Sequence, residues 1–171
     1  MATALKNLSK YDDASLPDCK KIRFGIVVAD WNQEITHSLY EACFSTLIKH
    51  GAVDKNIITI QVPGAYELTS ASALLIENKK IDAVISLGCV IKGETSHNEY
   101  INSSVAIGLT ELAMRTGIPC IFGLLTPNNW EQAKDRSGGK HGNKGVEAAV
   151  TAIRMVDLKT NLSKREAKIG F

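Results

Sequence analysis

The amino-acid sequence predicts an α/β protein, a three-layer αβα sandwich in which helices cover both faces of a four-stranded parallel sheet. The prediction depends on short, almost wholly apolar runs that alternate along the chain with segments of helical periodicity. Apolar runs rich in β-branched residues are typical of strands that are covered on both faces. The strands are expected at residues 22–29, 57–62, 83–91 and 119–125.

Helices are expected between and after these strands, where apolar residues recur at three- and four-residue steps. Gly51 and Gly117 stand where the first and third helices should end. The alternation of strands and helices requires right-handed crossovers and gives a doubly wound, flavodoxin-like order. In chain order, the helices are expected at residues 34–50, 66–78, 96–116, 130–136 and 146–158.

The chain is long enough for one folded domain. It has 171 residues, of which 44% are hydrophobic, so its core needs no disulfide or metal for stability. We expect the folded domain at residues 21–158, after a partly disordered N-terminal arm at 1–20 and before a polar C-terminal tail at 159–171.

The cysteines and the charges exclude several classes of protein. The four cysteines form no CxxC pair, and Cys43, Cys89 and Cys120 lie in apolar runs, which indicates buried thiols in a reducing compartment and no metal site. Residues 22–156 carry 12 basic and 13 acidic side chains, so we expect no nucleic-acid partner. Without a signal peptide or an apolar run of membrane-spanning length, we expect no membrane segment and a cytoplasmic location.

The segment after the third strand favours a phosphate site. In sheets of this type, ligands bind beyond the carboxyl ends of the strands. Residues 88–95 nearly match the Walker A pattern, but Glu94 replaces its lysine, which disfavours a triphosphate. Gly93, the Thr95 hydroxyl and the start of the next helix suit a monophosphate. An ordinary glycine turn with Thr95 or Ser96 as a helix cap is the alternative.

Other candidate residues stand at the same edge of the sheet. His97 begins the next helix and has the side chain that exchanges protons near neutral pH, although an incidental surface histidine is the alternative. The Trp31 side chain either stacks on a planar ring of a ligand or packs against a neighbouring subunit. Glu67 is either a ligand or a helix-capping residue. Arg136 and Lys144, in a long basic loop, either bind a phosphate or are simply solvated.

Five segments, in this order and spacing, closely resemble the 6,7-dimethyl-8-ribityllumazine synthase family over about residues 20–158. The resemblance implies that the protein condenses 5-amino-6-(D-ribitylamino)uracil with 3,4-dihydroxy-2-butanone 4-phosphate. It also implies that the reaction needs no metal or organic cofactor. The segments are Trp31-Asn32, Pro63–Glu67, Gly88–His97, Ile121–Thr126 and Gly142–Gly145.

The resemblance also implies a role for each site residue. His97 would transfer protons, and Trp31 would stack on the pyrimidine. The phosphate would be bound by the Glu94 backbone, Thr95 and Arg136; Glu94 stands where many members have a small residue, and Lys92 where many have arginine. The remaining substrate-binding residues would be Ala65, Tyr66 and Glu67 at the ribityl chain, Cys89, Val90 and Ile91 at the uracil, and Phe122 and Lys144.

Assembly is a further implication of the resemblance. The family forms homopentamers whose sites are shared between adjacent subunits, so Phe122, Arg136 and Lys144 would reach a neighbour's site. The short connection at residues 138–142 favours a hollow icosahedral shell of sixty subunits, which could encapsulate riboflavin synthase. Two other functions stay open: a cysteine hydrolase that uses Cys89 and His97, and a non-catalytic flavin carrier.

Overall fold

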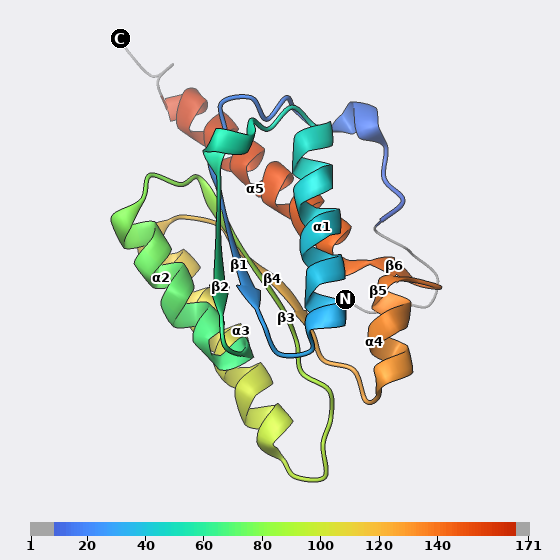
Figure 1. Ribbon diagram of the computed structural model, residues 1–171. Coiled ribbons are helices and arrows are strands. Elements are labelled where there is room, and N and C mark those ends of the chain that lie inside the picture. The colour runs from blue at the N-terminus through green and yellow to red at the C-terminus, as the bar shows by residue number, and fades with distance from the viewer. Residues whose placement is uncertain (1–8, 167–171) are drawn as a thin grey trace.

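The computed structural model describes residues 9–166 and shows a four-stranded sheet between two layers of helices (Figure 1). All neighbouring strands are parallel, in the order β2-β1-β3-β4. The predicted fold class is therefore confirmed. The strands are β1 (Phe24–Ala29), β2 (Ile57–Val62), β3 (Ala83–Cys89) and β4 (Cys120–Leu125).

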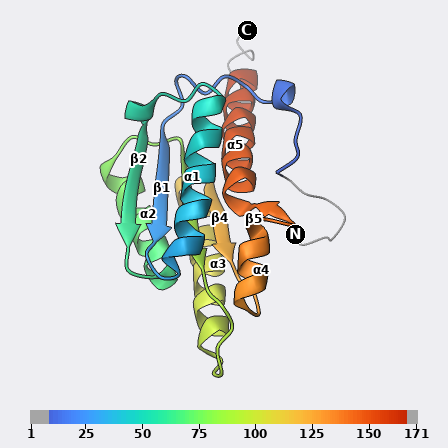
Figure 2. The ribbon, with the colours of Figure 1, turned by 45° about the vertical axis from the view of Figure 1, so that its right-hand side comes forward.

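Two long helices cover each face of the sheet. Helices α1 (Gln33–Lys49) and α5 (Lys144–Glu166) lie side by side on one face, as Figure 2 shows. Helices α2 (Leu68–Asn78) and α3 (His97–Thr116) cover the other. The shorter elements are α4 (Trp130–Arg136), the 3-10 turns η1 (Asp13–Ser15), η2 (Asp54–Asn56) and η3 (Ala65–Glu67), and the hairpin strands β5 (Ser137–Gly139) and β6 (Gly142–Asn143).

Some element boundaries differ from the sequence prediction. Strand β3 ends two residues early, and the second predicted helix starts as η3 before α2 begins. Helix α5 continues to Glu166, because no glycine or proline interrupts residues 159–166; these residues of the expected tail are helical. Residues 1–8 and 167–171 of the predicted arm and tail lie outside the described residues, and the domain boundaries stay predictions.

Strand β2 is less covered than its apolar sequence predicts. It stands at the edge of the sheet, and Thr59 and Gln61 are exposed. Strands β1 and β3, which lie inside the sheet, are buried along their whole length. The prediction that each strand is covered on both faces is therefore wrong for β2. An edge strand has a neighbouring strand on one side only, which leaves more of its side chains exposed.

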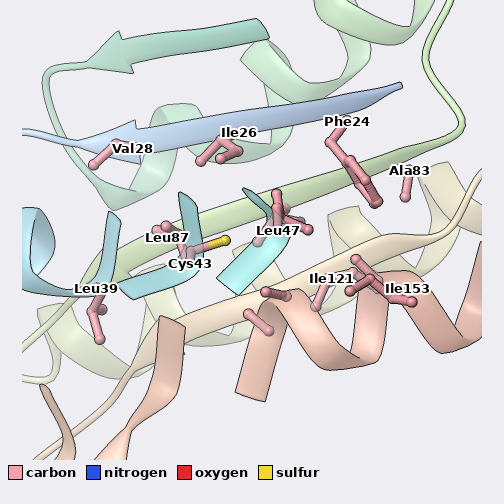
Figure 3. Close-up of a cluster of buried hydrophobic side chains, with 14 of the residues drawn as sticks. Phe24, Ile26, Val28, Leu39, Cys43, Leu47, Ala83, Leu87, Ile121 and Ile153 are labelled. Carbon is pink, nitrogen blue, oxygen red and sulfur yellow. The ribbon is translucent and has the colours of Figure 1, made fainter. Parts of the chain in front are cut away.

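Two apolar clusters hold the helices on the sheet. Because side chains alternate along a strand, Phe24, Ile26 and Val28 face α1 and α5 (Figure 3), whereas Val27 and Ala29 face α2 and α3.

The cysteines belong to this packing rather than to a disulfide framework. Cys43 and Cys89 are buried, as predicted, and Cys120 is half-buried. Cys19, which lies in a polar segment of the sequence, is buried as well. All four thiols, which lie in the described part of the chain, are free. Burial raises the pKa of the Cys43 thiol, so this side chain behaves as a small apolar residue.

A close backbone contact brings α1 and α5 together. A methyl group placed at Gly145 would overlap the carbonyl oxygen of Leu39 on α1, so a residue without a side chain is required. The Asn143 side chain spans the same contact. Its Oδ1 accepts from the Gly145 N–H at 2.7 Å, and its Nδ2 donates to the Ser38 carbonyl at 3.2 Å.

We expect Gly145→Ala to lower the free energy of unfolding by about 3 kcal/mol, because the methyl group would overlap backbone atoms that cannot move independently. The measurement is denaturant unfolding followed by circular dichroism. Gly93→Ala is the matched control: nothing lies within 4 Å of its added methyl group, and we expect a change below about 0.5 kcal/mol. Equal midpoints for Gly145→Ala and the wild type would contradict the tight contact.

Candidate active site

Two cavities lie at the carboxyl edge of the sheet, the lower edge in Figure 1. The larger, about 760 Å³, is enclosed by the loops after β1, β2 and β3 and by the start of α3. Nine of the thirteen predicted site residues line it: Trp31, Ala65, Tyr66, Glu67, Cys89, Val90, Ile91, Thr95 and His97. The smaller, about 460 Å³, is lined by Phe122, Arg136 and Lys144. Glu94 is exposed and lines neither cavity.

The loop after β1 is held by Asn32. This residue has a positive φ of 61°, a left-handed conformation that asparagine tolerates better than most residues. Its Nδ2 donates to the Cys89 carbonyl at 2.9 Å, which joins the ends of β1 and β3. Trp31 therefore stands at the rim of the larger cavity with 72% of its surface exposed. Sequence reasoning assigned no role to Asn32, although an asparagine between a strand and the helix that follows it is a signal for such a turn.

The loop after β2 directs a carboxylate to the cavity. Glu67 ends η3 and occupies the N-cap position of α2, but its side chain makes no capping hydrogen bond. Its Oε2 lies beside Gly64, only 3.2 Å from the position that a methyl group there would occupy. The capping alternative is therefore not supported, and the carboxylate can accept hydrogen bonds from a ligand.

The loop after β3 presents an uncapped helix end. Thr95 and His97 are exposed at the cavity, and Ser96, at the N-cap of α3, makes no side-chain capping hydrogen bond. Space is open around Gly93. The first N–H groups of a helix carry partial positive charge, so this geometry favours an anion site over the alternative of a capped glycine turn.

A buried carboxylate organises the smaller cavity. Glu147 is 3% exposed, and its carboxylate pairs with Arg136 at 3.1 Å and with Lys144 at 3.1 Å. Arg136 also donates to the His141 carbonyl at 3.3 Å. Asp135 lines the same cavity, so two carboxylates balance the charges of Arg136 and Lys144, and these cations offer a ligand hydrogen-bond donors rather than an excess of charge. Sequence reasoning missed Glu147; its spacing of three residues from Lys144 at a helix start was the available signal.

The Cys89 thiol is a poor nucleophile. It is 1% exposed, and burial raises its pKa to about 12. Because the thiolate is the reactive form, this environment disfavours the alternative of a cysteine hydrolase.

Residues 9–166 show neither a metal site nor a membrane-spanning helix. No group of three or more histidine, cysteine, aspartate or glutamate side chains there could hold a metal ion. None of the helices in this range has the length and apolarity to span a membrane.

Comparison with known sequences identifies the family. The sequence profile of the family described as 6,7-dimethyl-8-ribityllumazine synthase matches residues 21–160. The chain belongs to the 6,7-dimethyl-8-ribityllumazine synthase family. A lumazine synthase from Phocaeicola vulgatus is 51% identical over 97% of this chain and 99% of its own length. The one from Parabacteroides distasonis is 53% identical over 92% and 98%, and the one from Flavobacterium psychrophilum 48% identical over 100% and 88%.

The span matched by the lumazine synthase family contains both cavities and all thirteen predicted site residues. The resemblance predicted from the sequence is thus confirmed at the level of the family. Within one lumazine synthase chain, however, twelve of the thirteen predicted residues are divided between two cavities, and Glu94 lines neither. Arg136, Lys144 and Phe122 form one set, and the residues around Trp31 and His97 form the other.

Proposed function

We propose that the protein condenses 5-amino-6-(D-ribitylamino)uracil with 3,4-dihydroxy-2-butanone 4-phosphate to 6,7-dimethyl-8-ribityllumazine, releasing phosphate and water. This is the penultimate step of riboflavin biosynthesis and a transferase reaction. The observation that carries the proposal is the joint lining of one cavity by Trp31, Glu67, Thr95 and His97, in a chain of the lumazine synthase family. An aromatic side chain, a carboxylate, an anion-binding helix end and an imidazole are the groups that such substrates require.

The chemistry needs proton transfers and an anion site rather than a nucleophilic side chain. The amine attacks the ketone, a first water leaves to give an imine, and phosphate is eliminated; attack of the ribitylamino nitrogen on the remaining carbonyl then closes the ring with loss of a second water. In the proposal, His97 moves protons at the reacting nitrogen and oxygen atoms. Thr95, the start of α3 and Arg136 bind the phosphate. Trp31 stacks on the pyrimidine, and Ala65, Tyr66 and Glu67 bind the ribityl chain.

Mixing the protein with both substrates tests this function. The fluorescent lumazine should appear together with one equivalent of inorganic phosphate. Omitting either substrate is the control. Tight binding of a flavin without any product from the two substrates would contradict the proposal and favour the non-catalytic carrier.

We also propose that the protein is a cytoplasmic homo-oligomer whose sites are shared between adjacent subunits. Arg136, Lys144 and Phe122 of one subunit would complete the larger cavity of its neighbour. The exposed aromatic residues at that cavity support this arrangement. So does a stripe on α3, where Tyr100, Ile107 and Met114 recur at seven-residue steps and are 76%, 60% and 81% exposed. The proposed assembly is a pentamer within an icosahedral shell that could enclose riboflavin synthase.

Sedimentation and subunit mixing test the assembly. We expect a particle of about sixty subunits; a single pentamer would contradict the shell, and a monomer would contradict the shared sites. At a sugar-phosphate concentration well below the KM of Arg136→Ala, co-expression of His97→Ala and Arg136→Ala subunits should restore up to about a quarter of wild-type activity, because about one shared site in four then receives both native residues. Activity no higher than the two variants alone would contradict sharing.

We expect Arg136→Ala to raise KM for the sugar phosphate by about 10- to 150-fold, because hydrogen bonds to a charged group contribute about 1.5–3 kcal/mol. KM for the pyrimidine should change little. Steady-state kinetics with each substrate varied in turn provides the measurement. Lys140→Ala, an exposed lysine of the same loop, is the matched control and should behave as the wild type. An unchanged KM for the sugar phosphate would refute the role of Arg136.

We expect His97→Ala to lower kcat by about 10²- to 10⁴-fold, the usual contribution of a general acid or base. His37→Ala, on α1 and outside both cavities, should keep wild-type activity. The measurement is the initial rate of lumazine fluorescence at saturating substrates. Near-wild-type kcat in His97→Ala would mean that another group transfers the proton.

A further inference from the structure

The hairpin of β5 and β6 connects the two cations of the smaller cavity. Arg136 is the last residue of α4 and directly precedes β5, whereas Lys144 directly follows β6 and begins α5. The hairpin packs against both α1 and α4, and it lies beside α1 in Figure 1. A contact that fixes the hairpin on α1 therefore also fixes the main chain next to each cation.

One side chain of α1 makes such a contact with both strands of the hairpin. The Ser38 hydroxyl donates to the carbonyl group of Ser137 in β5 and accepts from Nδ2 of Asn143 in β6 at 3.3 Å. Ser137 and Asn143 are each 9% exposed. Leaving a buried polar group without its partner costs free energy, so this hydroxyl favours one position of the hairpin on α1.

The Ser137 carbonyl needs a partner from outside its own helix. Ser137 is the C-cap residue of α4, and the last carbonyl groups of a helix have no partner within that helix. The next residue, Gly138, has a φ of 121°, which no helical residue adopts. The Ser38 hydroxyl thus supplies a donor from α1 at the residue directly after Arg136.

Ser38 can influence a ligand through Arg136. It lines neither cavity, whereas Arg136 lines the smaller one. The guanidinium of Arg136 is held by the Glu147 carboxylate and the His141 carbonyl. The hydrogen bond from Ser38 holds the main chain at the other end of the same residue. An arginine binds a phosphate through a fixed geometry, so both ends affect how well it does so.

We infer that Ser38 is a positioning residue, which sets the place of Arg136 for phosphate binding through its hydrogen bond to Ser137. This inference rests on the proposed function, in which Arg136 binds the phosphate of the sugar substrate. It adds to the phosphate site a residue of α1 that does not itself line the site.

Ser38→Ala tests the inference. KM for the sugar phosphate should rise about 2- to 10-fold, the usual effect of losing one hydrogen bond. The inhibition constant of inorganic phosphate, measured against the sugar phosphate, should rise by a similar factor. By contrast, kcat and KM for the pyrimidine should stay close to wild type. Ser38→Thr keeps the hydroxyl and should lie nearer to wild type than Ser38→Ala does.

Ser45→Ala is the matched control. Ser45 lies on the same helix two turns further on and is exposed. Its replacement removes a hydroxyl from α1 without touching the hairpin, so both KM values and the inhibition constant of phosphate should match the wild type.

A double-mutant cycle separates positioning from a general structural role. Without the guanidinium of Arg136, Ser38 has nothing to place. Adding Ser38→Ala to Arg136→Ala should therefore change KM for the sugar phosphate less than about 2-fold, because residues that act through one contact are not additive. A merely structural role would instead lower kcat by the same factor in both backgrounds. Denaturant unfolding of each variant checks that it is folded.

The outcomes distinguish this inference from the proposed function. Absence of product with the wild type would overturn the proposed function and, with it, the inference. Product formation by the wild type with an unchanged sugar-phosphate KM in Ser38→Ala would overturn the inference alone. So would an equal effect of Ser38→Ala with and without the Arg136 guanidinium, or an equal effect of Ser45→Ala. If Ser38→Ala does not fold, Ser38→Cys, whose thiol is a weaker donor, gives the same decision.

Discussion

The contact between α1 and α5 at Leu39 and Gly145 fixes the two cavities of the chain relative to each other. Helix α1 begins directly after Asn32, and α5 begins at Lys144. The helix pair therefore sets the position of the loop that carries Trp31 against the loop that carries Arg136. The Asn143 hydrogen bonds to Ser38 and Gly145 hold this arrangement at the cavity side, while the apolar cluster of α1, α5 and the sheet holds it below.

The electrostatics of the site agree with a folded body that carries almost no net charge. A buried carboxylate is stable only when it is paired, and Glu147 is paired with both Arg136 and Lys144. Both cations also line the smaller cavity. A single phosphate needs a few hydrogen-bond donors and a helix end, in contrast to a nucleic acid, which needs an extended basic surface.

The sequence predicted the layers of the fold better than the details of the site. The sequence pattern predicted a strand at residues 57–62 and a helix at residues 130–136, and both elements have these bounds in the structure. The periodicity could not show that residues 57–62 form an edge strand. The order in which strands pair in a sheet cannot be read from the sequence of one strand. Glu147 escaped prediction for a related reason. A polar residue on a helix becomes informative only when the neighbouring elements show that it is buried.

Two local features gain little from the fold of an isolated chain, and both adjoin the larger cavity. Trp31 exposes a large apolar surface, and α3 begins without a side-chain cap. A planar ring on Trp31 and an anion at the start of α3 would each satisfy one of these groups. Their convergence on a single cavity is the strongest argument that the substrates, rather than the fold, account for these residues.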